Sequence, residues 1–291
     1  MFFQLLINGL IAGAIYALVA SGFSLIYSTN KFVHFAHGGV IAFSAYILYW
    51  LYSQLGLNFY LSVILTILFA SLLGYLINFI FYKPLRKKKS SPSILLIASI
   101  AIMILLESLV LLLFGADVKT INFLQQNIGV DIFGAIITPF QILIIIVSAI
   151  LFVSLFIFMK KTKIGKAMRA VADNKEVAEI VGISSEKIYN YSFVVGSAIA
   201  GIGAILIALE QNVNPTMGTS LMIKGFVAAI IGGIGSVPGA ILGAFLLGII
   251  ENFGIWFLPS GYKDAIAFTI LFIFLLFKPQ GILGIKTNLS K

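Results

Sequence analysis

Residues 5–27 read LLINGLIAGAIYALVASGFSLIY, an apolar stretch that contains no charged residue. A helix needs roughly 20 consecutive apolar residues to cross the hydrocarbon core of a bilayer. No basic residue precedes the stretch, whereas a cleaved signal peptide carries a positively charged region before a shorter apolar core. We therefore predict that residues 5–27 form a retained first membrane span.

The composition extends this interpretation to the whole chain. Of the 291 residues, 60% are hydrophobic and only 10% are charged, and the mean hydropathy is +1.11. Soluble domains are about 45–50% apolar and about 25% charged, and disordered chains are poor in apolar residues. These values exclude a soluble globular domain, a disordered chain and a coiled coil. We predict an all-α polytopic integral membrane protein, with residues 1–291 forming a single transmembrane domain.

Eight further apolar runs follow the first one. Each is expected to be helical, because a backbone in lipid must satisfy its hydrogen bonds within the segment. The run at 221–231 is too short to span a bilayer, and the helix-breaking stretch GGIGSVPG follows it at 232–239. We predict a helical bundle of about eight transmembrane helices plus a broken or re-entrant element. The runs cover 36–55, 59–82, 94–114, 137–159, 191–213, 221–231, 237–258 and 262–277.

Three basic clusters predict the orientation of these spans. Basic residues in short loops favour the cytoplasmic side, and two predicted spans separate the first cluster from the second. We therefore place all three clusters in the cytoplasm, the loop at 115–139 outside, and the N-terminus outside; a broken first or second segment would reverse the side of the N-terminus. The clusters hold 15 of the 19 Lys and Arg residues: Lys83, Arg86, Lys87, Lys88 and Lys89; Lys160, Lys161, Lys163, Lys166, Arg169, Lys175 and Lys187; and Lys278, Lys286 and Lys291.

The sequence offers no set of side chains for covalent chemistry. Cysteine is absent, and His34 and His37, which would share a helix face, lack the third ligand of a convincing metal site. We predict no catalytic residue, no bound metal, and a structural hydrogen bond for His34. Glu107 lies deep in a predicted span, where an ionisable side chain is costly, so we expect it to form a hydrogen bond or ion pair within the bundle.

The loop at 160–190 contains a short amphipathic helix. Asp173 and the acidic residue three positions later have capping-box spacing, and Gly182 supplies a stop. Between them, Val177, Ile180 and Val181 form an apolar stripe on one face. This stripe packs either on the inner surface of the protein and the lipid headgroups, or in a groove of a cytoplasmic partner.

Several stretches, in the same order over nearly the whole chain, resemble one known family. They are similar to the permease subunits of branched-chain amino acid ABC importers of the LivH type. His34 stands where the family usually has Asn, which concerns a local detail. The stretches are NGLIAGAIYALVASG at 8–22, FAHG at 35–38, GKAMRAVADNKEVAEIVGI at 165–183, NP at 214–215, IGGIGSVPG at 231–239, YKD at 262–264 and PQGILG at 279–284.

The resemblance implies a set of partners in the plasma or inner membrane of a bacterium or archaeon. They are a second homologous permease of the LivM type, two ABC ATPases of the LivG and LivF type, which would bind ATP and Mg, an extracytoplasmic substrate-binding protein and the lipid bilayer. This chain would bind no cofactor and no nucleic acid, and it contains no Gly-x-x-x-x-Gly-Lys-Ser/Thr loop for ATP. The residues that would couple it to the ATPases are Asp173, Glu176, Val177, Ala178, Ile180, Val181 and Gly182.

Two breaks, near 34–39 and 232–239, occupy comparable places in the two halves of the chain. Broken helices expose backbone polar groups that a zwitterion can contact, so we predict a translocation pathway there. Tight packing of broken helices is the alternative for each residue. The predicted pathway residues are Phe35, His37, Gly38, Gly39, Gly232, Gly233, Gly235 and Pro238.

The sequence leaves the substrate and two other classes of protein open. The family resemblance favours leucine, isoleucine and valine but extends to other amino acids and urea-like amides. An ion-coupled secondary transporter or channel would work without ATPases. An intramembrane enzyme would need a convergent nucleophile, base or metal set, which the sequence does not offer.

Overall fold

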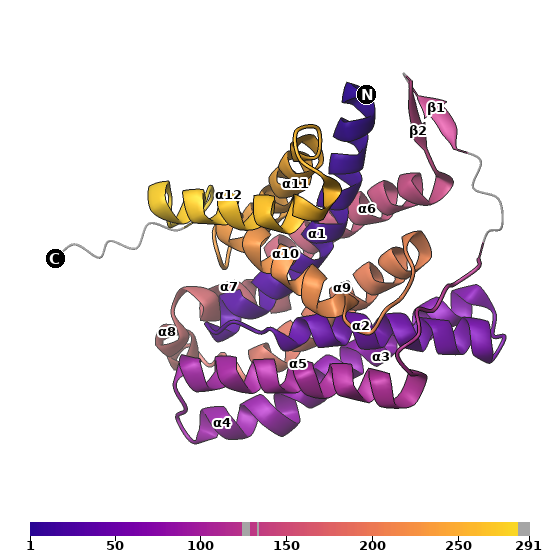
Figure 1. Ribbon diagram of the computed structural model, residues 1–291. Coiled ribbons are helices and arrows are strands. Elements are labelled where there is room, and N and C mark those ends of the chain that lie inside the picture. Colours follow the sequence, from indigo (N-terminus) through magenta and orange to yellow (C-terminus); the bar gives the residue numbers. More distant parts are fainter. Residues whose placement is uncertain (124–128, 133, 285–291) are drawn as a thin grey trace.

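The computed structural model describes residues 1–123, 129–132 and 134–284 as a bundle of helices (Figure 1). Within this part of the chain, seven helical segments are long and apolar enough to cross a membrane, which confirms the predicted polytopic helical class. They are α1 (Phe2–Asn30), α3 (Phe59–Ile77) with η2 (Asn78–Tyr82) and α4 (Lys83–Lys87), α5 (Pro92–Phe114), α6 (Pro139–Lys161), α9 (Ser185–Glu210), α11 (Val237–Gly254), and η3 (Ser260–Tyr262) with α12 (Lys263–Phe277).

Two further helices complete the bundle. The first, α2 (Ala36–Tyr49), continues directly into the π-helical segment η1 (Trp50–Gln54). The second, α10 (Met217–Gly232), is about 24 Å long at 1.5 Å per residue, which is short of the roughly 30 Å hydrocarbon core. The predicted short element is therefore confirmed, although it begins four residues earlier than the apolar run.

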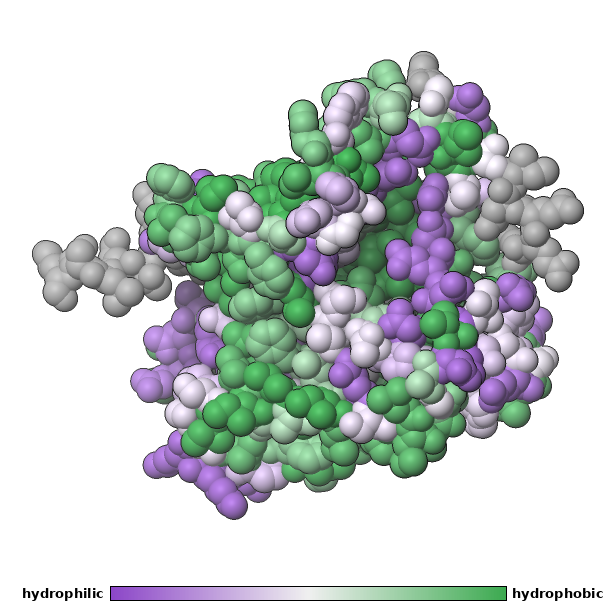
Figure 2. All heavy atoms as spheres, in the orientation of Figure 1, coloured by the Kyte–Doolittle hydropathy of each residue, from purple (hydrophilic) through white to green (hydrophobic). Residues whose placement is uncertain are grey.

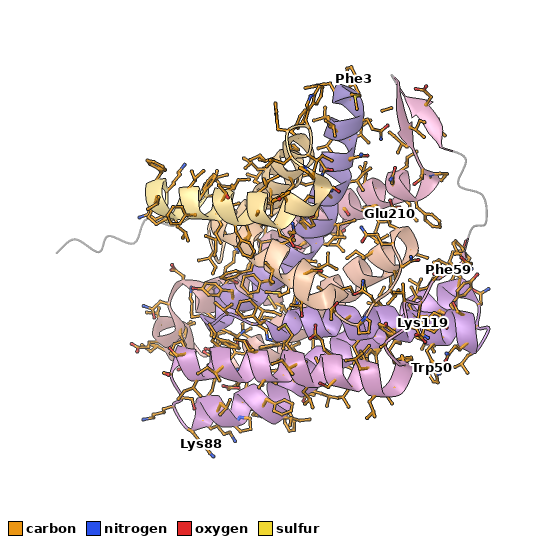
Figure 3. All side chains as sticks on the ribbon, viewed as in Figure 1. Phe3, Trp50, Phe59, Lys88, Lys119 and Glu210 are labelled. Atoms are coloured by element: carbon orange, nitrogen blue, oxygen red, sulfur yellow. The ribbon has the colours of Figure 1, made fainter. Side chains whose placement is uncertain are left out.

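The two ends of the bundle differ in character. The basic α4 and the cytoplasmic-loop helices α7 (Lys163–Asp173) and α8 (Lys175–Ile180) belong to the end at which Figure 3 labels Lys88, whereas Trp50, Phe59 and Lys119 lie at the opposite end. The hairpin of β1 (Val130–Ile132) and β2 (Ala135–Ile137) also lies away from the basic end. This arrangement agrees with the predicted orientation; Lys286 and Lys291 lie outside the described residues.

The N-terminus lies beside this hairpin. The Gln4 side chain donates from Nε2 to the carbonyl oxygen of Ile136 over 3.1 Å, and the Ile136 amide donates to Gln4 Oε1 over 2.8 Å. Since these bonds join the first turn of α1 to the loop between α5 and α6, the N-terminus lies on the same side as that loop. The structure thus supports the predicted outer N-terminus.

The central helix α1 packs directly on α11 through small residues. A Cβ atom at Gly9 would lie 2.9 Å from the Ile249 Cα, and one at Gly13 would lie 2.8 Å from the Phe245 Cα. Such distances require glycine, and small residues let helix backbones approach closely in lipid. The buried face of α1 thereby forms the core of the bundle, with α9 and α10 packed against other sides.

The break after α10 closes against the C-terminal segment. The Ile282 amide donates to the Ile231 carbonyl over 2.9 Å, and the Leu283 amide donates to the Gly232 carbonyl over 2.8 Å. Gly233 has a φ of 111°, a conformation that favours glycine. The predicted helix break is therefore present, and backbone hydrogen bonds from Ile282 and Leu283 hold it in place.

The outer loop contains a two-stranded hairpin. In the β1–β2 pair, Val130 stands opposite Ile137. Earlier in the loop, Lys119 forms an isolated bridge with Val213. Residues 124–128 and 133 lie outside the described part of the loop.

Candidate functional site

A cavity of about 400 Å³, most of whose lining residues are polar, opens on the face that α5, α10 and α12 share. In Figure 2, hydrophilic residues form a band across this face, between hydrophobic surfaces that belong to α12 and α5. Lipid cannot satisfy polar side chains of this kind, so this face requires water or another protein. The cavity is lined by Glu107, Asn214, Thr216, Thr219, Ser220, Ile223, Asp264 and Phe268.

The polar lining follows from where α10 begins. The backbones of Gly38 and Gly218 meet so closely that a Cβ atom at Gly38 would lie 2.6 Å from the Gly218 carbonyl oxygen. Because Gly38 belongs to the first turn of α2, this contact places the start of α10 inside the bundle. Thr219 and Ser220, in the first turn of α10, therefore face the cavity.

Glu107 lines the cavity from α5. It lies in the half of that helix nearer the outer end, and the Thr219 hydroxyl donates a hydrogen bond to its Oε1 atom. The predicted hydrogen bond of Glu107 within the bundle is thereby confirmed. The bond joins α5 to the short helix α10 at the cavity wall.

A buried ion network lies behind the cavity. The Lys224 ammonium is 2.5 Å from Glu251 Oε1 and 2.8 Å from Asp264 Oδ1. The Tyr16 hydroxyl donates to Glu251 Oε2 over 2.8 Å. The Glu251 side chain is 0% exposed and that of Lys224 is 8% exposed, whereas Asp264 is 72% exposed and lines the cavity. The network joins α1, α10, α11 and α12.

Sequence reasoning missed this network. It considered only Glu107 as an ionisable residue deep within a span and did not pair Lys224 with Glu251. The usable signal is a lysine and a glutamate within consecutive apolar segments, since buried charges in membranes are paired. The position of Asp264 also stabilises α12, because a carboxylate in the first turn of a helix interacts favourably with the helix dipole.

The predicted pathway residues fall into two separate groups. Phe35, His37, Gly38 and Gly39 lie at the start of α2, where Gly38 packs against Gly218 near the N-terminal end of α10 and the Phe35 ring packs on Phe226. Gly232, Gly233, Gly235 and Pro238 lie at its C-terminal end, where a Cβ atom at Gly232 would overlap the Gly239 carbonyl. The two groups therefore contact different parts of α10, and neither group is among the residues that line the cavity described above.

The two histidines are buried in the bundle. His34 Nδ1 lies 2.9 Å from the Tyr82 hydroxyl, which confirms the predicted structural hydrogen bond. His37 packs against Gly22, where a Cβ atom would come within 2.9 Å of the His37 ring. Among the described residues, no group of three or more His, Cys, Asp or Glu side chains is placed to hold a metal ion.

The cytoplasmic-loop helix starts one residue later than predicted. Asp173 is the last residue of α7, and the Asn174 side chain caps α8 by accepting the Val177 amide over 3.1 Å. The predicted capping box at Asp173 and Glu176 is therefore wrong, because Asn174 has the extended backbone that a cap requires. Asp173 instead lies close enough to Lys31 to act on its charge. Burial lowers the pKa of the Lys31 ammonium, and the Asp173 carboxylate opposes that shift.

The end of α8 and the direction of its stripe are clear. Gly182 has a φ of 86°, which confirms the predicted stop. Val177, Ile180 and Val181 are 54%, 83% and 68% exposed, whereas Ala178 is buried at 2% against the rest of the protein. The apolar stripe therefore points away from the chain's own inner surface, and of the coupling residues predicted from the sequence, Ala178 faces the core.

A bundle of membrane-crossing helices with a polar cavity on one face and an exposed apolar helix at its basic end has the features of a membrane transport permease. The chain belongs to the family described as the permease component of branched-chain amino acid transport systems, whose family model matches residues 5–275.

Relatives of nearly full length support this assignment. The high-affinity branched-chain amino acid transport system permease protein BraD of Pseudomonas aeruginosa is 36% identical, over 97% of this chain and 96% of BraD. The corresponding protein LivH of Escherichia coli is 33% identical, with the same shares covered. Among solved structures, PsaBC from Streptococcus pneumoniae in complex with Fab has a TM-score of 0.52 at 16% identity, covering 94% of this chain and 91% of that one. This last likeness concerns the fold alone.

Proposed function

We propose that this chain is the membrane-spanning permease subunit of an ABC importer for branched-chain amino acids. The similarity to BraD and LivH over nearly the full length carries this proposal. The chain acts in the plasma or inner membrane of a bacterium or archaeon and transports rather than catalyses. ATP and Mg bind to separate ATPase subunits, which hydrolyse the ATP, since this sequence has no phosphate-binding loop.

The docking element for an ATPase subunit is α8. Its exposed stripe of Val177, Ile180 and Val181 is the kind of apolar helix face that binds in a hydrophobic groove. The stripe lies at the basic end of the bundle, where the positive-inside rule places the cytoplasm. Movement of the ATPases would reach the bundle through α7, whose Met168 and Val171 are buried in it.

The passage for the amino acid lies along the cavity face. A second homologous permease covers this face, because lipid cannot solvate the carboxylate of Glu107 or the exposed carboxylate of Asp264. The break residues take part as the tightly packed ends of α10, with Gly38 beside its start and Gly232, Gly233 and Gly235 at its end. An extracytoplasmic binding protein would deliver the substrate to the end that carries the β1–β2 hairpin.

Purification in a mild detergent tests the class of transporter. We expect a second permease and two ATPases to co-elute with this chain, and proteoliposomes containing the complex and a binding protein to accumulate leucine only with ATP. Leucine transport by the purified chain alone, without ATP, would instead identify an ion-coupled secondary transporter or channel.

Competition identifies the substrate. Unlabelled isoleucine and valine should suppress uptake of labelled leucine, whereas urea and a polar amino acid such as glutamine should not. If urea or glutamine suppressed the uptake of labelled leucine but isoleucine and valine did not, the chain would transport a different substrate within the same family.

A further inference from the structure

Among the described residues, the lining of the cavity includes two carboxylates and no cation. Glu107 reaches it from α5 and Asp264 from α12, so the two acidic groups come from different helices. The other polar groups of the lining are uncharged, namely those of Asn214, Thr216, Thr219 and Ser220. The cavity wall therefore has an acidic character that a collection of amides and hydroxyls would lack.

Lys224, the cation that contacts Asp264 of the lining, is already paired. The Lys224 ammonium is buried and lies between Glu251 and Asp264, so it faces two carboxylates with a single charge. Glu107 forms no ion pair with any described residue, and its hydrogen bond from Thr219 is neutral on the donor side. The four ionisable groups at and behind the wall thus carry three formal negative charges and one positive charge.

The rest of the lining matches an amphiphilic amine. Ile223 and Phe268 supply apolar surface in the same cavity as the two carboxylates. The volume of about 400 Å³ is within the range of roughly 300–1,000 Å³ that is usual for small-molecule sites. An ammonium group can approach the carboxylates while a branched aliphatic side chain lies on the apolar pair.

We propose that Glu107 and Asp264 form a charge filter, which draws the ammonium end of an amino acid into the cavity and disfavours anions. Clefts lined by one sign of charge concentrate solutes of the opposite sign. The charge filter rests on the proposed function, because it states which end of the transported amino acid the passage recognises. Lys224 and Glu251 act as positioning residues, which fix Asp264 at the rim.

Reaction rates of an introduced thiol measure this charge directly. Because the chain has no cysteine, Ser220→Cys places a single thiol in the cavity lining. Membranes containing the complete importer are treated with a trimethylammonium-ethyl or a sulfonatoethyl methanethiosulfonate, and modification is followed by the mass of this chain. We expect the cationic reagent to react faster, by roughly three- to ten-fold after correction for intrinsic reactivity.

Two variants locate the source of the preference. Glu107→Gln removes the charge and keeps a carbonyl that can accept the Thr219 hydrogen bond, and we expect it to lower the cation-to-anion rate ratio by roughly three-fold or more. Asp264→Asn should also lower the cation-to-anion rate ratio. The matched control is Glu210→Gln, since Glu210 also accepts a side-chain hydrogen bond, from Gln141 over 2.9 Å, but lies outside this cavity; its ratio should not change.

Protection identifies the ligand class. We expect 3-methylbutylamine to slow modification of Ser220→Cys by an uncharged methanethiosulfonate, whereas 4-methylpentanoate, a branched carboxylate, should not. Equal protection by the two compounds, a ratio near one in the parent, or a ratio that Glu107→Gln leaves unchanged would overturn the charge filter. Failure of the uncharged reagent to react at all would also overturn it, because the cavity would not be accessible.

These measurements separate the filter from the proposed function. The rate ratio needs neither ATP nor a branched-chain amino acid. A cation preference in a complex that does not import leucine would refute only the substrate assignment. Leucine import with no cation preference would refute only the filter.

Discussion

The helix α8 and the cavity face are opposites in their chemistry. At the water-facing end of the bundle, α8 exposes Ile180 and Val181, which are apolar. On the membrane-facing side, the cavity exposes Glu107 and Asp264, which are acidic. Each region presents side chains that its surroundings would exclude, and each therefore indicates a partner or passage that supplies the missing environment.

The two regions also differ in how they are supported. The cavity rests on a buried ion network that joins four helices, whereas α8 is held by a single buried residue, Ala178, and a side-chain cap. Variants that break the ion network should therefore unfold the cavity face. Variants in α8 should leave the bundle intact. The variants below test this contrast in order of decreasing effect.

Lys224→Met should have the largest effect. It leaves Glu251 buried at 0% exposure without a cation, and removal of one partner from a buried pair costs about 3–5 kcal/mol. We expect a large fall in thermal stability and in the yield of assembled complex in detergent.

The double variant Lys224→Met with Glu251→Met is the control for this effect. Replacing both partners by apolar residues removes the uncompensated charge and should recover much of the lost stability. A double variant as unstable as the single one would show that the network is not an energetic unit.

Ile180→Asp with Val181→Asp should abolish coupling without unfolding the bundle. Buried interface anchors contribute about 2 kcal/mol or more each, so we expect at least a roughly ten-fold loss of ATPase co-elution and leucine uptake. Thermal stability of the isolated permease should hardly change, because both side chains are exposed. The matched control is Val118→Asp, at an exposed valine outside α8; co-elution as weak in the control as in the α8 variant would contradict docking at α8.

Gly38→Ala tests the start of α10. The added methyl group would lie 2.6 Å from the Gly218 carbonyl oxygen, and overpacking of this kind typically costs about 1–3 kcal/mol. We expect a measurable fall in melting temperature. Gly203→Ala is the control, since its Cβ would meet Leu18 at an ordinary 3.4 Å; equal destabilisation by both would refute a special backbone contact at Gly38.

Asn174→Ala should have the smallest effect. Loss of a helix N-cap costs about 1 kcal/mol, and only the short helix α8 depends on this cap. We expect a few-fold decrease in ATP-dependent uptake with an unchanged melting temperature. Asp173→Ala is the comparison, and a larger decrease there than at Asn174 would restore the capping box predicted at Asp173.

Some parts of the site could be predicted because their signals are local. The apolar stripe of α8 and its stop at Gly182 follow from spacing along one helix, and the structure presents the stripe as exposed. The cap was placed one residue early, since Asp173 and Asn174 are both acceptable caps and only the backbone at Asn174 distinguishes them. Local patterns thus find an element more reliably than its first residue.

The sequence by itself determined the apolar spans, the basic clusters that predict their orientation, the short segment before Gly232 and the apolar stripe of α8. Lipid imposes these features on each segment separately, through hydrophobic length and the placement of basic residues. Only the tertiary structure decided that Lys224 meets Glu251 and Asp264, and that Glu107 shares a cavity with the first turn of α10. Such contacts join residues far apart in the chain and depend on helix packing, which hydropathy and periodicity along a single segment do not encode.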